Sequence, residues 1–283
     1  MRSLRRPRRG RETTGPAGIV DERVLAVTID DVVSKVTDPY ERQARLYPAL
    51  LALLPLLAML GLLYAPATTA LAGTLTVLVS CGGLYFMTSV CREFGKRLEE
   101  RLYGEWGGKP STLLLRHRDR TIESVTKLRY HAFLAAKIGR AFPDSEQETQ
   151  NPEKADDLYQ SGVRWLLNHT RPDDTKRFDL LLKENISYGF RRNALGIKPM
   201  GLTIAVGCLL WVLVRQALIL FTSACPFNDI GALWRLPENV AASLIVSVAM
   251  LAAWLFFFTK ATVRTAAFTY AETLLRACDV LER

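Results

Sequence analysis

Charged and uncharged stretches alternate along this chain, and the longest uncharged stretch runs from Leu46 to Cys91. A helix that crosses a bilayer needs about 20 apolar residues, so this stretch is long enough for two crossings. Tyr64 and Pro66 stand near its middle. We expect the chain to reverse there, because proline lacks a backbone donor and tyrosine favours the headgroup region. Residues 47–91 are therefore predicted to form a first transmembrane hairpin.

Two further apolar runs lie in the last third of the chain, from Met200 to Phe221 and from Val240 to Thr259. Each is about as long as one crossing. Residues 200–259 are therefore predicted to form a second transmembrane hairpin. No glycine or proline follows Asn239, so the last crossing is expected to continue without a break into a cytoplasmic C-terminal helix over residues 260–283.

Residues 92–199, between the hairpins, are rich in charge and have apolar residues at helical spacing, with no alternation typical of strands. They are predicted to form a helical cytoplasmic domain. A charged extension of the second crossing should end in the glycine-rich residues 104–111. Three helices should follow: one from about Thr121 to Gly139, a second, and a third opened by Pro172. Their expected apolar faces are Ile122, Val125, Leu128, Ala132, Phe133 and Ala136, then Leu158, Gly162, Trp165, Leu166 and His169, then Phe178, Leu181, Leu182 and Ile186.

The residues before the first hairpin have two parts. Residues 1–18 hold six arginines and no apolar stripe, which predicts a disordered basic tail that is either attached to anionic lipid or simply solvated. Residues 19–46 show helical spacing and are predicted to form cytoplasmic amphipathic helices. Asp38 and Pro39 fit the N-cap and first position of the helix that leads into the first crossing.

The distribution of charge gives the expected orientation. The chain has 37 Lys and Arg against 28 Asp and Glu, a formal net charge of +9. All the basic residues except Arg215 and Arg235 lie near the termini or in residues 92–199. Because basic residues collect on the cytoplasmic side, both termini and the middle domain are expected inside. The sequence predicts an all-α integral membrane protein, with two transmembrane helical hairpins flanking a helical cytoplasmic domain.

The chain offers little catalytic chemistry. Its five cysteines and three histidines lack the spacing of metal ligands, so neither a metal nor another cofactor is expected. Only Cys225 falls on the expected outer side, where it has no intrachain partner. No nucleophile–base arrangement stands out, and no carboxylate lies inside a predicted span. We therefore expect a non-enzymatic protein without catalytic residues.

Polar residues are dense between Glu184 and Pro199, where the cytoplasmic domain joins the third span. Arginine forks and a stacking aromatic ring suit a planar anionic ligand, and glycines at 189 and 196 suit a hinge. The predicted ligand-binding or coupling residues are Asn185, Tyr188, Arg191, Arg192 and Asn193. Plain anchoring is the alternative, because the basic residues here are also expected to meet lipid phosphates.

A second candidate site is the glycine-rich loop of residues 104–111 with the basic residues after it. Its glycines expose backbone N–H groups, and Lys109, Arg116 and Arg118 are candidates for contact with an anion. Proline follows Lys109, so the pattern is not that of a P-loop. A simple connector between helices is the alternative.

Arg215 and Gln216 are polar residues predicted to lie deep in the third span, where no span offers an acidic partner. A charge at mid-bilayer costs about 2.5–3.5 kcal/mol on insertion scales. Arg215 therefore either snorkels to the outer surface or faces water, an anion or a neighbouring subunit.

This plan of two hairpins around one cytoplasmic helical domain resembles the four-span membrane effectors of bacterial nucleotide-signalled anti-phage (CBASS-type) systems. The resemblance lies in architecture, length and domain placement along the whole chain, and no motif is matched residue by residue. It implies an effector that a cyclic nucleotide or a partner switches on to damage the inner membrane. Binding to the cytoplasmic domain would then rearrange the spans.

The expected partners are a bilayer with anionic headgroups, further copies of the chain in a homo-oligomer, and a cytoplasmic nucleotide or protein. No nucleic acid polymer is expected. Two other functions fit the same architecture. One is a non-enzymatic adaptor that recruits cytoplasmic partners, and the other is a small oligomeric channel or transporter.

Overall fold

The computed structural model describes most of the chain, and all of its secondary-structure elements in the described residues are helical. Predictions for the basic tail, for helices before Asp38, and for Pro66, Pro172 and Cys225 fall outside the described residues. The residues described are 38–64, 70–171, 176–216 and 235–282, without the side chains of 70–81.

The elements begin with a capped turn that leads into the first long helix. Asp38 is the N-cap, its side chain accepts a hydrogen bond from the backbone N of Tyr40, and Pro39 follows at the first position, as predicted. In chain order the elements are α2 (Pro39–Glu41), the π-helical η1 (Arg42–Leu46), α3 (Tyr47–Tyr64), α4 (Ala70–Trp106), α5 (Pro110–Leu115), α6 (Ser124–Ile138), α7 (Ser145–Gln150), α8 (Pro152–His169), α9 (Asp179–Arg215), α10 (Glu238–Ala252), the π-helical η4 (Ala253–Phe257) and α11 (Lys260–Leu281).

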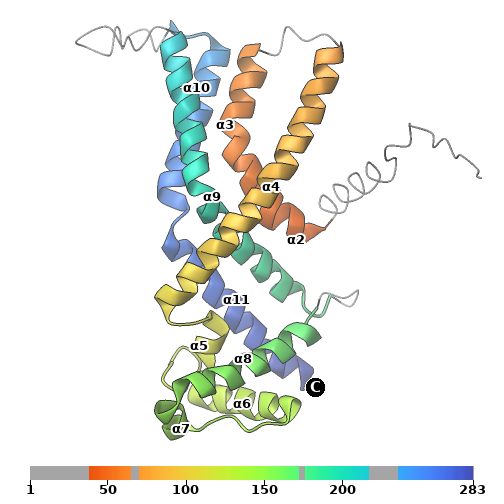
Figure 1. Ribbon diagram of the computed structural model, residues 1–283, viewed down its shortest axis with the longest axis vertical. Coiled ribbons are helices and arrows are strands. Elements are labelled where there is room, and N and C mark those ends of the chain that lie inside the picture. Colours follow the sequence, from red (N-terminus) through yellow and green to blue (C-terminus); the bar gives the residue numbers. More distant parts are fainter. Residues whose placement is uncertain (1–37, 65–69, 172–175, 217–234, 283) are drawn as a thin grey trace, which may run out of the picture.

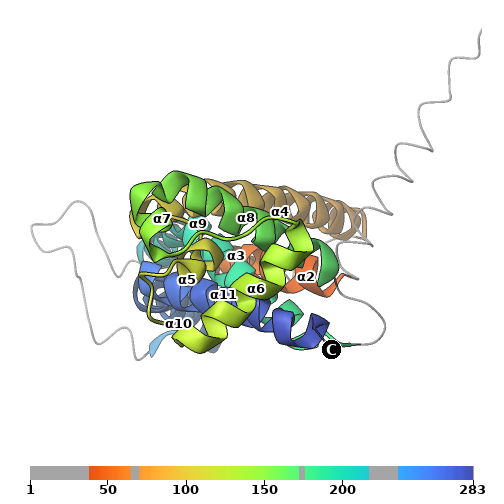
Figure 2. The same cartoon turned by 90° about the horizontal axis from the view of Figure 1, so that it is seen from below.

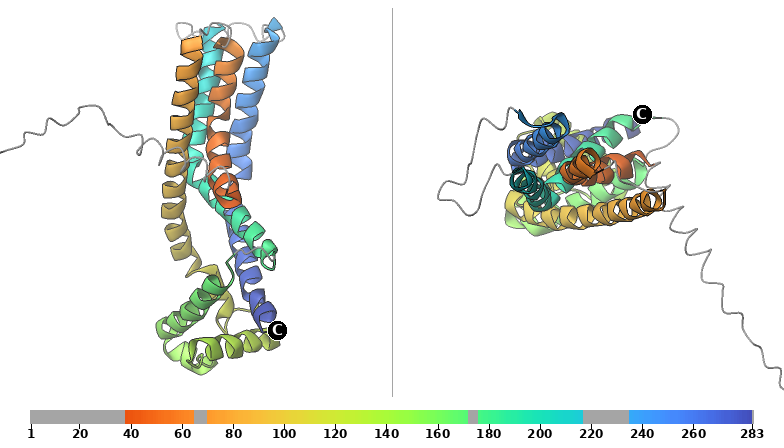
Figure 3. Two further views of the ribbon diagram at one scale, coloured as in Figure 1. Left: turned by 90° about the vertical axis from the view of Figure 1, so that its right-hand side faces the viewer. Right: turned by 90° about the horizontal axis from the view of Figure 1, so that it is seen from above.

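Three helical segments are long and apolar enough to cross a membrane: Pro39–Tyr64, Asp179–Arg215 and Glu238–Phe257. They contain α3, α9 and α10, whose upper parts lie side by side with the first half of α4 (Figures 1 and 3). Helices α5 to α8, here called the end domain, lie at the opposite end of the molecule and are nearest the viewer in Figure 2. The described chain is thus an all-helical protein with membrane-length helices at one end.

Two helices connect the bundle to the end domain. Helices α4 and α9 are each 37 residues long, and neither is interrupted along its length. The charged extension predicted after residue 91 is confirmed, since α4 ends at Trp106, just before Gly107 and Gly108, whose φ angles are 80° and 145°. Helix α9 continues through Pro199, where the sequence suggests a boundary. Each helix therefore runs without a break from the bundle toward the end domain.

Helices α4 and α9 meet at two glycines. A Cβ on Gly196 would lie 2.7 Å from the backbone N of Gly95, and a Cβ on Gly95 would overlap the side-chain amide of Asn193. Small residues allow this close approach of two helices. Residues 189 and 196 belong to an unbroken helix in this structure, where these glycines serve close packing, and the hinge expected there stays a prediction.

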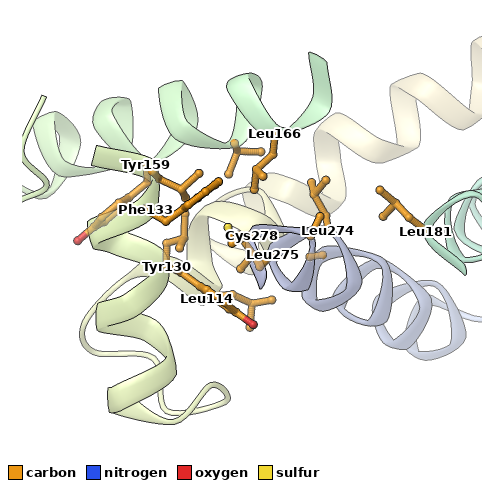
Figure 4. Close-up of a cluster of buried hydrophobic side chains, with 14 of the residues drawn as sticks. Leu114, Tyr130, Phe133, Tyr159, Leu166, Leu181, Leu274, Leu275 and Cys278 are labelled. Carbon is orange, nitrogen blue, oxygen red and sulfur yellow. The ribbon is translucent and has the colours of Figure 1, made fainter. Parts of the chain in front are cut away.

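A hydrophobic core joins the end domain to α11 and the start of α9 (Figure 4). The predicted apolar face of α9 is confirmed in its buried residues Phe178, Leu181 and Ile186. Helix α11 also has one buried apolar face, and its second half packs on the domain that precedes α9. Its buried members on that face are Val263, Ala267, Ala271, Leu274 and Cys278.

The apolar face predicted for α6 is mostly wrong, although Phe133 is buried and Ile122 packs on the same core. Val125 and Leu128 are 79% and 58% exposed, whereas Lys127 is buried. The Nζ of Lys127 donates to the carbonyl oxygens of Arg116 and Asp119 at 2.8 and 2.5 Å. These bonds satisfy backbone oxygens just beyond the end of α5, which an apolar face would leave unpaired.

The buried face of α8 is also shifted from the prediction. Gly162 and Leu166 are buried as expected, but Tyr159 is buried in place of Leu158. The hydroxyl of Tyr159 donates to the carboxylate of Glu148 at 2.8 Å. Tyr159 is therefore the buried residue of this pair, because its hydroxyl has a polar partner in the core.

The predicted continuous helix after the last apolar run is wrong. Helix η4 ends at Phe257, and α11 starts again after Thr259, whose side chain caps it by accepting from the backbone N of Thr262. The Nζ of Lys198 donates to the carbonyl oxygens of Leu255 and Phe258, at 3.3 and 3.0 Å. Lys198 thus satisfies the carbonyls that the break exposes, so the chain breaks here without glycine or proline.

Substitution of Gly196 by alanine should loosen the contact between α4 and α9. The added Cβ meets backbone atoms of Gly95, which cannot rotate away, so the free energy of unfolding in detergent should fall by about 1–3 kcal/mol. Gly207→Ala is the matched control, because it lies on the same helix and a Cβ added there would have no neighbouring atom within 4 Å. It should be neutral or slightly stabilising, since alanine favours helix. Equal effects at both positions would contradict close packing at Gly196.

Candidate functional site

A cluster of polar side chains fills the contact between α4 and α9 below the bundle. We call it the junction network and define it as Glu99 and Tyr103 of α4 with Tyr188, Arg192 and Asn193 of α9. Three of these residues were predicted from the sequence as ligand-binding or coupling residues. The structure brings them together around the carboxylate of Glu99.

One oxygen of Glu99 accepts three hydrogen bonds. The Nη1 of Arg192 donates at 2.7 Å, the hydroxyl of Tyr188 at 2.7 Å and the hydroxyl of Tyr103 at 3.0 Å. The guanidinium of Arg192 also lies over the ring of Tyr188, 5.5 Å from its centroid. Such charge-assisted bonds are stronger than bonds between neutral groups, so they hold α4 and α9 in one register.

Asn193 extends the junction network to a third element. Its Oδ1 accepts from Nε and Nη2 of Arg192, both at 3.2 Å, and its Nδ2 donates to the carbonyl oxygen of Ala44 at 2.7 Å. Ala44 belongs to η1, which leads into α3. The side chain of Asn193 is fully buried. It therefore couples the start of α3 to the ion pair between α4 and α9.

The charges of the network are balanced inside the protein. Burial raises the pKa of Glu99, but the charge of Arg192 and the hydrogen bonds from Tyr188, Arg192 and Tyr103 outweigh it, so the pKa lies below its usual value of 4.5. Glu99 is thus ionised at neutral pH. Arg192 is 7% exposed, and without this carboxylate its charge would be buried and uncompensated.

A cavity of about 310 Å³, here called the junction cavity, lies between this network and the end domain. Three tyrosine rings line it, from α4, α9 and α11, and those of Tyr188 and Tyr270 are nearly parallel at 7°. Thr112 lines it as well, and its buried hydroxyl has no hydrogen-bond partner among the described residues. The principal polar and aromatic lining residues are Glu99, Tyr103, Lys109, Ser111, Thr112, Gln160, Arg164, Tyr188 and Tyr270.

The basic residues predicted as an anion site separate in the structure. Lys109 lines the junction cavity, where its Nζ donates to Oε1 of Gln160 at 3.3 Å. Arg116 is instead bound to Asp156 through two hydrogen bonds of 2.8 and 2.5 Å, so its charge is already neutralised. Arg118 is exposed in the loop after α5. Lys109 is therefore the member of this group that could meet a ligand in the cavity.

The other predicted residues of α9 lie outside the junction network. Arg191 lines a separate groove, on a different side of the helix from Arg192. Asn185 is half-buried one turn before Tyr188 and makes none of the hydrogen bonds of the network. The pair of adjacent arginines thus serves two different surfaces.

Arg215 and Gln216 stand at the end of α9. Arg215 is its last helical residue and is exposed, and Gln216 is its C-cap. One turn earlier, the indole Nε1 of Trp211 donates to the hydroxyl of Tyr64 at 3.1 Å. Tyrosine and tryptophan favour the membrane–water interface, so this position at a helix end favours snorkelling over a buried polar path.

Glu99, Tyr103 and Tyr270 are functional candidates that reasoning from the sequence missed. Glu99 lies in a run of charged residues that is typical of any exposed helix, and nothing in its spacing marks it as buried. A pattern that could have singled it out is the pair Glu99 and Tyr103, four residues apart on one helical face. Comparison of the chain with protein families, curated proteins and solved structures finds no match.

Replacing Glu99 by glutamine should destabilise the protein strongly. The change keeps the shape but leaves the charge of Arg192 buried without a counter-ion, so we expect a loss of about 3–5 kcal/mol in the free energy of unfolding. Chemical unfolding in detergent, followed by circular dichroism, measures this loss. Glu93→Gln is the matched control, since its pair with Arg97 is exposed, and should change stability by less than about 1 kcal/mol.

The pH dependence provides an independent check of the same substitution. A carboxyl group whose pKa is lowered on folding stabilises the protein above its unfolded pKa, and this contribution is lost as the pH falls through the folded pKa. The stability difference between the wild type and Glu99→Gln should therefore be full at neutral pH and shrink below pH 4.5. A difference that is constant down to acid pH would show that the carboxylate charge is not responsible.

Proposed function

We propose that this chain is a four-span inner-membrane effector that a small anionic ligand controls by binding at the junction cavity. The three membrane-length helices supply three spans. We assign the fourth to α4, because its residues 70–91 carry no charge and it lies beside the other three (Figure 3). The end domain and both termini are assigned to the bacterial cytoplasm, because the basic residues concentrate there.

The observation that carries this proposal is that the junction cavity is lined from both parts of the molecule. Tyr103 and Tyr188 stand on α4 and α9, which continue into the bundle, whereas Lys109 and Gln160 belong to the loop before α5 and to α8. A ligand that fills the cavity would contact both parts together. Its affinity would then differ between arrangements of the two parts, which is what a ligand-driven change requires.

The lining favours an anionic ligand with a flat ring. Lys109 and Arg164 supply positive charge, while the charge of Glu99 is neutralised by Arg192. Tyrosine rings from α4, α9 and α11 offer stacking surfaces. Nucleotides belong to this ligand class. In the proposed mechanism, the ligand displaces α4 against α9, and the displacement perturbs the membrane.

A non-enzymatic adaptor is the second candidate, and the exposed side of α6 favours it. Val125 and Leu128 lie on that side, one turn apart, and are 79% and 58% exposed. Helix α6 itself lies at the end of the molecule away from the bundle (Figure 1). An exposed apolar strip suits contact with another protein. In an adaptor, this strip would recruit the partner, and the junction cavity would have no control over the membrane.

Filling the junction cavity should abolish the response to its ligand. Leu167 lines the cavity and is 44% exposed, so Leu167→Trp can fold while its ring occupies the ligand space. The measurement is release of a self-quenching dye from vesicles that contain the protein, on addition of each member of a panel of nucleotides and other organic phosphates. We expect release with at least one compound for the wild type and none for Leu167→Trp.

Leu128→Trp is the matched control, because Leu128 is similarly exposed but lies on α6, away from the cavity lining. It should release dye as the wild type does. Release that persists in Leu167→Trp would place the ligand elsewhere. Binding to the wild type without any release would favour the adaptor over the effector.

The orientation can be tested with a cysteine in the end domain. Cys278 is unsuitable, since it is 1% exposed and burial raises its pKa to about 12, so its thiol reacts poorly. Ser145→Cys, at the exposed start of α7, should react with an impermeant maleimide only after cell lysis. The variant is made in a chain whose Cys225 is replaced by serine, which removes the thiol expected outside. Labelling of Ser145→Cys in intact cells would contradict the assigned orientation.

A further inference from the structure

A second hollow of about 380 Å³, here called the inner groove, lies between the start of α3, the first half of α9 and the end of η4. It is distinct from the junction cavity, with which it shares no lining residue. The residues that carry the inference are Tyr47, Lys183, Ser187, Phe190, Arg191 and Phe257. The groove thus combines two basic side chains, a hydroxyl and three aromatic rings.

The charge of the groove is uncompensated within the described part of the chain. No carboxylate lines it, and neither Lys183 nor Arg191 forms a salt bridge with any described residue. The nearby arginines differ in this respect, since Arg192 is paired with Glu99 and Arg45 with Glu41. The groove is therefore complementary to an anion, because it holds two cations without a described counter-ion and a hydroxyl beside them.

The position of the groove indicates what kind of molecule carries that anionic group. Tyr47 opens the apolar helix α3, and Phe257 closes the apolar segment of α10 and η4, so both stand where a membrane-length segment meets the charged part of the chain. Their side chains are 44% and 55% exposed. Exposed aromatic rings at this level favour the boundary between acyl chains and headgroups. Lys183 and Arg191 lie on α9 on the charged side of Pro199.

We infer that the inner groove binds an anionic phospholipid. Its phosphate contacts the guanidinium of Arg191, which can donate two parallel hydrogen bonds, and the ammonium of Lys183 adds charge. The aromatic rims formed by Tyr47, Phe190 and Phe257 contact the upper part of the acyl chains. Charge and apolar contact together select a lipid over free phosphate, which the aromatic rims could not hold. The site does not depend on the proposed effector function.

The experiment measures lipid retention by the full-length protein purified in detergent. Native mass spectrometry counts bound phosphatidylglycerol against phosphatidylcholine of equal chain length. We expect one phosphatidylglycerol to be retained preferentially. In Lys183→Gln with Arg191→Gln, its affinity should fall about tenfold, because each basic residue near an anionic lipid contributes to binding. Phe257→Ala should also weaken it, through loss of the apolar rim.

Matched variants separate the groove from general attraction to a charged surface. Arg92 and Lys96 are exposed on α4 near the same boundary but do not line the groove, and Phe256 is 80% exposed beside Phe257. Arg92→Gln with Lys96→Gln, and Phe256→Ala, should retain the lipid. Equal loss in the groove and control variants overturns the inference. The inference is also overturned if glycerol phosphate displaces the lipid at equal concentration, because the groove would then be a site for free phosphate.

Discussion

The buried charge of Arg192 is the constraint on which the junction depends. A guanidinium that is 7% exposed requires a carboxylate at hydrogen-bond distance, and Glu99 provides it from another helix. That distance is reached only because α4 and α9 approach closely at Gly95 and Gly196. The glycines and the ion pair are therefore one arrangement, in which close backbone contact places two charges together and the charges fix the register of the contact.

The same helix carries two surfaces that the sequence does not separate. Arg191 and Arg192 are neighbours, but successive residues of a helix point about 100° apart, so one lines the inner groove and the other joins the network. From the sequence alone, both belong to a single basic cluster at the end of a predicted span. Their roles differ because Arg192 faces Glu99 of α4, whereas Arg191 faces the groove between the start of α3 and the end of η4.

Some features of the fold depend on a single physical requirement, and the sequence predicts these well. The apolar runs follow from the absence of water in a bilayer, and the end of α4 follows from two glycines with positive φ. The faces of α6 and α8 and the break before Thr259 were mispredicted, because polar groups from distant elements decide them. Lys127 and Tyr159 are buried by partners on other elements, and Lys198 caps a helix end 57 residues away. Spacing along one helix carries no information on such partners.

The candidate site was half predicted for the same reason. Its α9 residues stand out as polar residues next to an apolar run, whereas Glu99 and Tyr103 look like any exposed helical face. Helix α9 contributes residues to both the junction cavity and the inner groove. Its Tyr188 lines the junction cavity and its Arg191 the inner groove, and no break in the helix lies between them. Under the two proposals, a displacement of α9 on binding at one site would change the other site, so ligand and lipid would be coupled through one rigid helix.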